Sequence, residues 1–279
     1  MTRALPRAHF NSSRLVRFLS ENQLADAAPS GDDVGQKLGD WLNFRQAIAL
    51  HAVLNPEPTS VATAAHLRRA AAVPPEALSR HVQKVRVQLE ESIMLGAPPG
   101  SGLTRIEMPP AEWEEPIDVK TAFEPYRRFY SAHQRQMEST LQNLRAQVRS
   151  QLQKNTGPLQ TLAALDAAFE NILSERESML LAKVAKLHEK RFVQALKQHL
   201  QKQTLASTST TTTSTTTTTP ITTEAGENES AYVTDLEKNA WLMPLRQALR
   251  TALLAELDTR LQPTLGLLEA LHAHTPKAP

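Results

Sequence analysis

Two long stretches of the chain, residues 123–153 and 159–205, carry apolar residues mainly at intervals of three or four positions. This spacing places the apolar side chains of each stretch on one face of a helix. Between the stretches, Gly157 can end the first helix in a left-handed conformation and Pro158 can begin the second. We therefore expect an antiparallel, coiled-coil-like helical hairpin over residues 123–206.

The two predicted helices differ in length. With about 32 and about 46 residues, the second would project roughly 20 Å beyond the first, at about 1.5 Å per residue. The projecting end still carries leucines. It therefore needs to be covered by a third helix, by the N-terminal region or by a second copy of the chain.

The residues before the hairpin divide into two parts. Residues 1–96 contain four short amphipathic patterns with brief connections, which predict a small N-terminal helical bundle. The clearest pattern covers residues 34–53 as one helix, and a shorter one covers residues 60–72. Residues 97–122 are rich in proline, and we expect them to form an irregular connector.

Two further segments follow the hairpin. Residues 207–219 are all serine or threonine, and the low-complexity composition extends to about residue 230. Such a composition cannot bury enough apolar surface to fold, so residues 207–230 are expected to be a disordered linker. Residues 231–279 return to a helical leucine pattern, which predicts a C-terminal helix packed on the hairpin. Pro244 and Pro263 lie inside this pattern and are expected to bend or break the helix.

The composition supports an all-α fold and excludes several kinds of chemistry. The chain has 9 glycines and only 3 tryptophans, 3 tyrosines and 7 phenylalanines, which favours helix over sheet. Because there is no cysteine, disulfides, cysteine-ligated zinc and thiol nucleophiles are excluded. No apolar run is long enough for a membrane span and no secretory signal pattern is present, so we expect a cytoplasmic location.

The net charge of +2 conceals a gathering of basic residues on the predicted hairpin. The face of the hairpin away from the apolar stripes is expected to be solvated and basic. Two such helices side by side could follow a phosphate backbone or an anionic membrane surface. The alternative is an ordinary solvated coiled-coil face, partly neutralised by the acidic C-terminal helix. The candidate surface for an anionic partner consists of Arg127, Arg128, Arg135, Arg145, Arg149, Lys183, Lys186, Lys190, Arg191 and Lys197.

No catalytic, cofactor-binding or metal-binding residue is predicted. His188 and Glu189 lack the second histidine that a metalloprotease helix requires. The glycines at Gly96, Gly100 and Gly102 lack the Lys-Ser/Thr pair of a phosphate-binding loop. We therefore expect no cofactor and no enzymatic activity.

Three short stretches resemble a known family. They are residues 38–42 (LGDWL), residues 47–50 (AIAL) and residues 261–271 (LQPTLGLLEAL). They are similar to a proteobacterial family catalogued as domain of unknown function 3348, and the likeness covers nearly the full length of the chain. The threonine tract departs from that family's pattern, as an expanded linker would.

The resemblance implies no activity, cofactor or catalytic residue, because the family has none to carry over. It implies a bacterial cytoplasmic protein whose relatives tend to be encoded beside inner-membrane proteins of the proton-channel stator type and beside outer-membrane-anchoring partners. An adaptor near such an assembly would fit this implication.

The apolar stripes and the lack of a catalytic pattern together favour a non-enzymatic scaffold or adaptor. It would bind partner helices, or a second copy of itself, by burying these stripes. The second hypothesis is a nucleic-acid-associated protein that uses the basic hairpin, which predicts binding that weakens steeply with salt.

Overall fold

The computed structural model describes residues 13–22, 24, 34–55, 73–111, 118–155, 157–210 and 240–274. None of these residues lies in a strand, so the predicted all-α fold is confirmed. The helices are α1 (Arg14–Glu21), α2 (Val34–Trp41), α3 (Phe44–Leu54), α5 (Pro75–Leu95), α6 (Glu124–Gln153), α7 (Pro158–Thr210), the short 3₁₀ helix η2 (Ala240–Leu242) and α9 (Met243–His274). No helix in these ranges is both long and apolar enough to cross a membrane.

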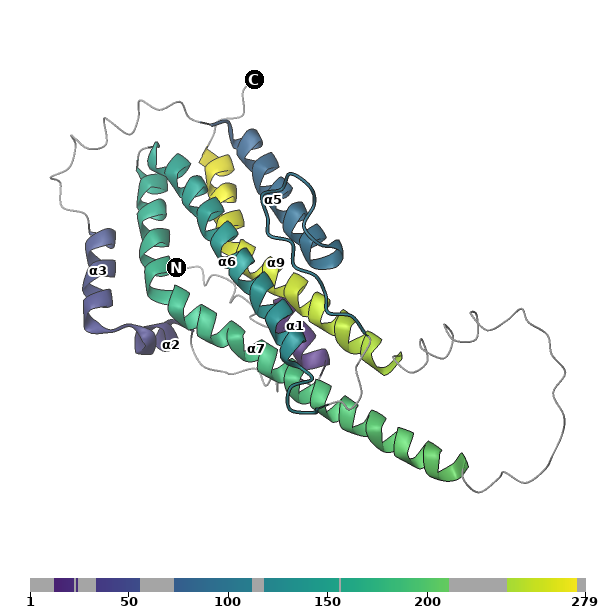
Figure 1. The fold of residues 1–279 in the computed structure, drawn as a ribbon. Helices are drawn as coiled ribbons and strands as arrows, with labels where there is room; N and C mark the ends of the chain where they lie inside the picture. Colours follow the sequence, from purple (N-terminus) through teal and green to yellow (C-terminus); the bar gives the residue numbers. More distant parts are fainter. Residues whose placement is uncertain are drawn as a thin grey trace, which may run out of the picture.

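Helices α6 and α7 form the predicted hairpin and run antiparallel along each other (Figure 1). Gly157 joins them with a φ of 70°, in the left-handed region that glycine adopts without strain. Pro158 is the first residue of α7, where its missing N–H costs no helical hydrogen bond. The core of the hairpin includes Tyr126, Tyr130, Met137, Leu141, Leu144, Val148, Leu152, Leu159, Val184, Phe192 and Leu196.

The two arms of the hairpin are unequal, as the sequence predicts. Helix α6 has 30 residues and α7 has 53, and the end of α7 extends beyond the other helices (Figure 1). Helix α7 reaches Thr210 and so includes residues 207–210, which were expected to belong to the linker. Serine and threonine cost only a few tenths of a kcal/mol each relative to good helix formers once a helix is nucleated. The rest of the predicted linker lies outside the described residues.

Helix α9 returns along the hairpin and contacts α5, α6 and α7 as well as α1 (Figure 1). Pro263 lies inside α9, and the helix bends along its length but is not broken. Pro244 is the second residue of α9, in the first turn, where proline is tolerated. The two prolines therefore have different effects: Pro263 accompanies a bend, and Pro244 marks the start of the helix.

Helices α1 and α5 share one core with the hairpin instead of forming a bundle of their own with α2 and α3. Helix α1 packs on α9, α3 packs on α7, and α5 packs on α9 and α6. Phe18 of α1 and Leu78, Val82 and Leu89 of α5 belong to the same apolar cluster as the hairpin. A separate bundle over residues 1–96 is thus not what the described residues form. Helices α1 and α5 bury their apolar stripes against the longer helices, whereas α3 lies against α7 without a fully buried residue.

The single helix predicted over residues 34–53 is in fact two helices, α2 and α3. Asn43 caps α3: its side-chain oxygen accepts the N–H of Gln46 at 2.8 Å, and the Gln46 side chain accepts the N–H of Asn43 at 3.0 Å. This reciprocal pair satisfies backbone donors that a helix start leaves without partners. The helix expected over residues 60–72 lies outside the described residues.

The described part of the proline-rich connector, residues 97–111, contains no helix and lies along α6. The Tyr126 hydroxyl donates to the carbonyl oxygen of Pro110 at 3.1 Å. Gln136 Nε2 donates to the carbonyl oxygen of Thr104 at 2.9 Å. Side chains of α6 therefore satisfy backbone carbonyls that the connector cannot pair within itself.

Candidate functional site

The basic residues of α6 that lie closest to the hairpin turn are used inside the fold. The side chains of Arg145 and Arg149 are only 16% and 13% exposed. Arg145 binds both carboxylate oxygens of Asp166, at 2.5 and 2.9 Å, and Arg149 contacts Asp166 at 3.0 Å as well as Glu170. The expectation that Arg145 and Arg149 lie on a solvated basic face is therefore wrong. They face acids on α7, and the helix periodicity of α6 alone does not reveal those acids.

The basic residues at the start of α6 are exposed but paired. Arg127 Nη2 lies 2.5 Å from Glu189 Oε1 of α7, and Arg128 Nε lies 3.2 Å from Glu124 Oε1. Exposed pairs of this kind contribute about 0–1 kcal/mol to stability. These arginines remain at the surface, but acids already compensate their charge.

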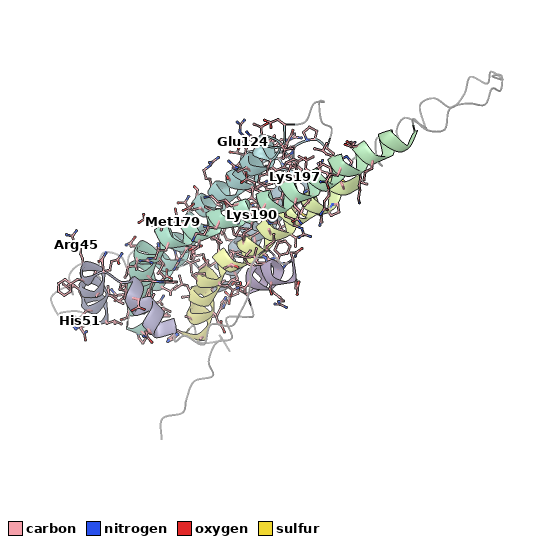
Figure 2. The ribbon with its side chains drawn as sticks, turned by 90° about the horizontal axis from the view of Figure 1, so that it is seen from below. Arg45, His51, Glu124, Met179, Lys190 and Lys197 are labelled. Carbon is pink, nitrogen blue, oxygen red and sulfur yellow. The ribbon has the colours of Figure 1, made fainter. Side chains whose placement is uncertain are left out.

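Four lysines of α7 form an exposed row that we call the lysine stripe: Lys183, Lys186, Lys190 and Lys197. Their spacing of three, four and seven residues places them on one face of the helix. All four are exposed, and none forms an ion pair with a described residue. Figure 2 shows Lys190 and Lys197 in succession along α7, with Met179 before them.

The last two residues of the predicted basic surface stand apart from the lysine stripe. Arg135 is exposed on α6. Arg191 donates from Nη1 to the side-chain oxygen of Asn22 at 3.1 Å, just beyond the end of α1. Of the ten predicted residues, the structure therefore brings only the four lysines together in a continuous row without acidic partners among the described residues.

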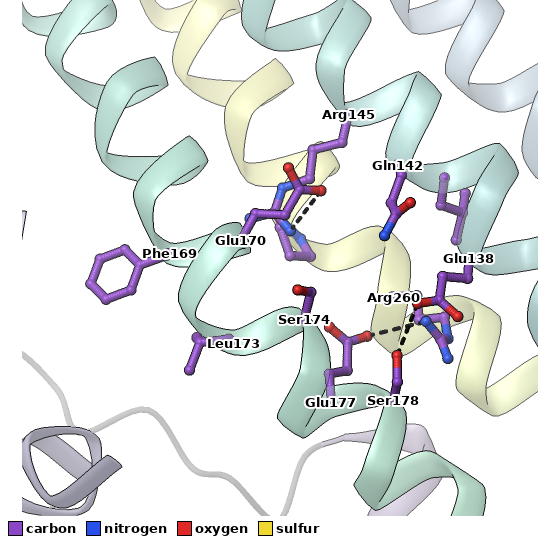
Figure 3. A pocket seen from close by; sticks show the side chains of 12 residues that line it. Glu138, Gln142, Arg145, Phe169, Glu170, Leu173, Ser174, Glu177, Ser178 and Arg260 are labelled. Carbon is purple, nitrogen blue, oxygen red and sulfur yellow. Dashed lines mark hydrogen bonds and ion pairs between the residues drawn. The ribbon is translucent and has the colours of Figure 1, made fainter. Parts of the chain in front are cut away.

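A cavity of about 140 Å³ lies where α6, α7 and α9 meet (Figure 3). Arg260 Nη1 lies 3.6 Å from Glu177 Oε1 in its wall, and the Ser178 hydroxyl donates to Glu138 at 2.9 Å. These charged groups already have partners, so they do not form a ready site for a charged ligand. Pro263 also lines the cavity, so the cavity lies beside the bend of α9. The remaining lining residues are Leu141, Gln142, Arg145, Phe169, Glu170, Leu173 and Ser174.

A buried carboxylate, Glu256, joins α9 to α6. It accepts hydrogen bonds from the Tyr130 hydroxyl at 3.1 Å, from Gln134 Nε2 at 3.0 Å and from Arg260 Nε at 3.0 Å. Burial raises the pKa of Glu256 above its ordinary value, and its three partners oppose this increase. Because the partners are fixed in the core, this network favours one docking of α9 on α6.

Two histidines are buried in the same core, and neither resembles a metal ligand or a general base. The Nε2 atoms of His133 and His188 have no hydrogen-bond partner among the described residues. Burial lowers the pKa of both side chains to about 4, so both are neutral at pH 7. Within the described part of the chain, no group of three His, Asp or Glu residues could hold a metal ion.

Helix α3 presents an apolar surface to solvent. Phe44 and Ile48, one turn apart, are 83% and 54% exposed, and Ala47 beside them is also exposed. We call these three residues the α3 face. Next to α3, Trp41 is 39% exposed, and the guanidinium of Arg176 from α7 lies 5.5 Å from the centre of its ring. Exposed large apolar residues gathered in this way mark interaction sites.

The sequence analysis did not predict the α3 face or the buried Glu256, although the sequence contains an indication of each. Ile48 lies on the apolar stripe of residues 34–53, which predicts burial, yet α3 is apolar on more than one side and so has more apolar surface than a single contact needs. Glu256 lies between Leu253 and Leu257 in the leucine pattern of α9, and an acid at such a position indicates a buried polar group.

The fold and these surfaces define an all-α protein in which a long helical hairpin carries a returning C-terminal helix and shorter N-terminal helices. Residues 1–273 match a family described as a protein of unknown function (DUF3348), and the chain belongs to this family. The resemblance inferred from the short stretches is therefore confirmed. Comparison with curated proteins and with solved structures finds no match.

Proposed function

We propose that this protein is a non-enzymatic helical adaptor that binds a protein partner through the α3 face. The observation that carries the proposal is the exposure of Phe44, at 83%, beside Ile48 on a helix of three turns. Aromatic and aliphatic side chains gathered on one helix face act as anchors for a partner helix.

The charge around the α3 face points to the chemistry of the partner. Helix α3 contains no acidic residue, and Arg45 is exposed beside Phe44. Figure 2 shows Arg45 and His51 on α3 at one end of the molecule. An amphipathic helix with acidic residues bordering its apolar face would complement this surface in both shape and charge. The resemblance to relatives encoded beside inner-membrane proteins suggests where such a partner should be sought.

Site-specific photo-cross-linking in cells tests the adaptor proposal. The photoreactive residue p-benzoylphenylalanine replaces Phe44, and the matched control carries it at Arg80, which is exposed on α5. We expect the Phe44 probe to capture one protein through an amphipathic segment with acidic residues, and Ile48→Glu to abolish this capture. The variant Arg80→Glu should leave it unchanged.

Three results would contradict the adaptor proposal. They are identical cross-links from both probe positions, no cross-link from Phe44, and a cross-link only to a second copy of this chain. The last result would identify self-association instead of an adaptor.

Nucleic-acid association is the second candidate, and it has lost part of its support. It relied on two basic arms, whereas Arg145 and Arg149 are engaged with Asp166 and Glu170. The lysine stripe is the observation that still favours an anionic partner. Retention on DNA or RNA that weakens steeply with salt would support this candidate, and a flat binding curve at low salt would end it.

A further inference from the structure

The lysines of the stripe form no ion pair with a described residue, so their charge contributes to no contact between helices. Its four lysines extend over roughly 21 Å of α7, at about 1.5 Å per residue. Like charges three and four residues apart on a helix are mildly destabilising, so the row contributes nothing to the stability of α7. Such a row attracts an anionic partner over a distance of several ångströms.

Acidic residues near the stripe do not neutralise it. Beyond Glu177, the only acid of α7 is Glu189, which points to α6 and lies 2.5 Å from Arg127. Of the four acids that precede the stripe on α7, Asp166 and Glu170 are paired with arginines of α6 and Glu177 with Arg260 of α9, while Glu175 is exposed two turns before Lys183. Most acids of α7 are therefore paired within the fold, whereas the four lysines of the stripe are exposed.

Apolar side chains continue the stripe at its N-terminal end. Met179 lies four residues before Lys183 on the same helix face and is 56% exposed, and its neighbour Leu180 is 51% exposed. One turn earlier, Arg176 lies over the half-buried ring of Trp41. The surface thus combines lysines with exposed methionine, leucine and tryptophan.

We propose that the lysine stripe, with Met179, Leu180 and Trp41 at its end, is a docking surface for an anionic lipid bilayer. Lysines place their ammonium groups among anionic headgroups, while the apolar side chains enter the boundary with the acyl chains. A nucleic-acid backbone would use the lysines but not Met179 or Leu180. Between Lys183 and Lys197 bases would find no stacking partner, because the one phenylalanine, tyrosine or tryptophan of that segment, Phe192, is 1% exposed, and Trp41 offers a ring only at the end of the surface. This proposal is independent of the partner of the α3 face.

The shape of the molecule permits such docking. Helix α7 bends and then continues as a long rod whose end extends past the other helices (Figure 1). Met179, Lys190 and Lys197 follow one another along this rod (Figure 2). A rod at the edge of a bundle can lie flat on a surface without any change in the core.

Vesicle co-sedimentation of the full chain tests the proposal. One set of vesicles is phosphatidylcholine alone, and the other is an equal mixture of phosphatidylcholine and phosphatidylglycerol. A double-stranded DNA fragment of mixed sequence serves as the competing anionic probe. The stripe variant combines Lys183→Gln, Lys186→Gln, Lys190→Gln and Lys197→Gln. The control variant loses the same number of positive charges from other exposed positions through Arg80→Gln, Lys84→Gln, Arg105→Gln and Lys120→Gln.

We expect binding to the mixed vesicles and little binding to phosphatidylcholine alone. Each lysine near an anionic surface is worth about fivefold in partitioning, so the stripe variant should bind roughly several hundredfold more weakly than the control variant. Met179→Ser with Leu180→Ser should weaken vesicle binding severalfold and leave any DNA binding unchanged. Circular dichroism checks that every variant remains folded.

Several outcomes would overturn the proposal. Equal vesicle binding by the stripe and control variants would show that net charge alone is responsible. Binding to DNA but not to the mixed vesicles would assign the stripe to nucleic acid. If the Met179 and Leu180 substitutions do not affect vesicle binding, the apolar part of the proposed surface is wrong.

Discussion

Replacing Tyr130 with phenylalanine tests whether the buried carboxylate network fixes α9 to the hairpin. Tyr130 is 0% exposed, and its hydroxyl donates to Glu256 at 3.1 Å. Hydrogen bonds to charged groups contribute about 1.5–3 kcal/mol, and those from hydroxyls to carboxylates are usually shorter, about 2.5–2.7 Å. Because this bond is long, we expect Tyr130→Phe to lower the free energy of unfolding by about 1.5–2 kcal/mol at neutral pH.

The cost of Tyr130→Phe should depend on pH. The pKa of Glu256 is raised above its ordinary 4.5 by burial, so this residue contributes stability at low pH that is lost as pH rises through the folded pKa. The Tyr130 hydroxyl favours the ionised carboxylate, so removing it raises the folded pKa further. The loss of stability should therefore grow as pH increases from about 4.5 towards neutrality.

Urea denaturation followed by far-ultraviolet circular dichroism measures both effects. Tyr126→Phe is the matched control, because the Tyr126 hydroxyl donates to the neutral carbonyl of Pro110 at 3.1 Å. It should cost about 1 kcal/mol with little dependence on pH between about 4.5 and about 7. An equal, pH-independent loss in both variants, or no loss in Tyr130→Phe, would refute the assigned role of the Glu256 network.

Three further substitutions test other parts of the structure. Asp166→Ala removes a carboxylate that contacts two largely buried arginines, Arg145 and Arg149, and should lower the free energy of unfolding in urea denaturation by about 2–4 kcal/mol. Glu107→Ala, from an exposed ion pair, should lower it by about 0.5 kcal/mol or less. The pKa of His188 is lowered to about 4. The free energy of unfolding of the wild-type protein should therefore fall by up to about 1.4 kcal/mol per pH unit through this residue as pH falls below about 6.5. His188→Leu should flatten that slope. Leu253→Ala, at a fully buried position of α9, should cost about 2–5 kcal/mol, whereas Leu95→Ala, at an 87% exposed position, should leave the melting temperature nearly unchanged.

Local patterns in the sequence predict the hairpin well because its causes are local. Gly157 and Pro158 determine the turn, and the spacing of apolar residues determines the buried face of α6. The break at Asn43 is local as well, but its signal is a capping box, which the search for apolar periodicity overlooks. Attention to the residues that can cap a helix would have divided residues 34–53 correctly.

The positions of charges could not be derived in the same way, because they depend on how two helices are aligned. Periodicity places Arg145 and Arg149 away from the main apolar stripe, which predicts that their side chains face solvent. Only the packing of α6 on α7 brings Asp166 and Glu170 opposite them. Between Lys183 and Lys197 the sequence contains one acid, Glu189, and the lysine stripe lacks an acidic partner because Glu189 contacts Arg127 of α6 instead.

The exposed charges of the lysine stripe and the largely buried ion pairs between α6 and α7 should respond differently to ionic strength. At a physiological concentration of ions the screening length is about 8 Å, so attraction at the water-facing lysines is readily weakened, whereas pairs shielded inside the fold are affected much less. Concentrated electrolyte should consequently detach whatever the lysine stripe holds and leave the helices assembled. The molecule could then be released and recaptured repeatedly without passing through an unfolded state.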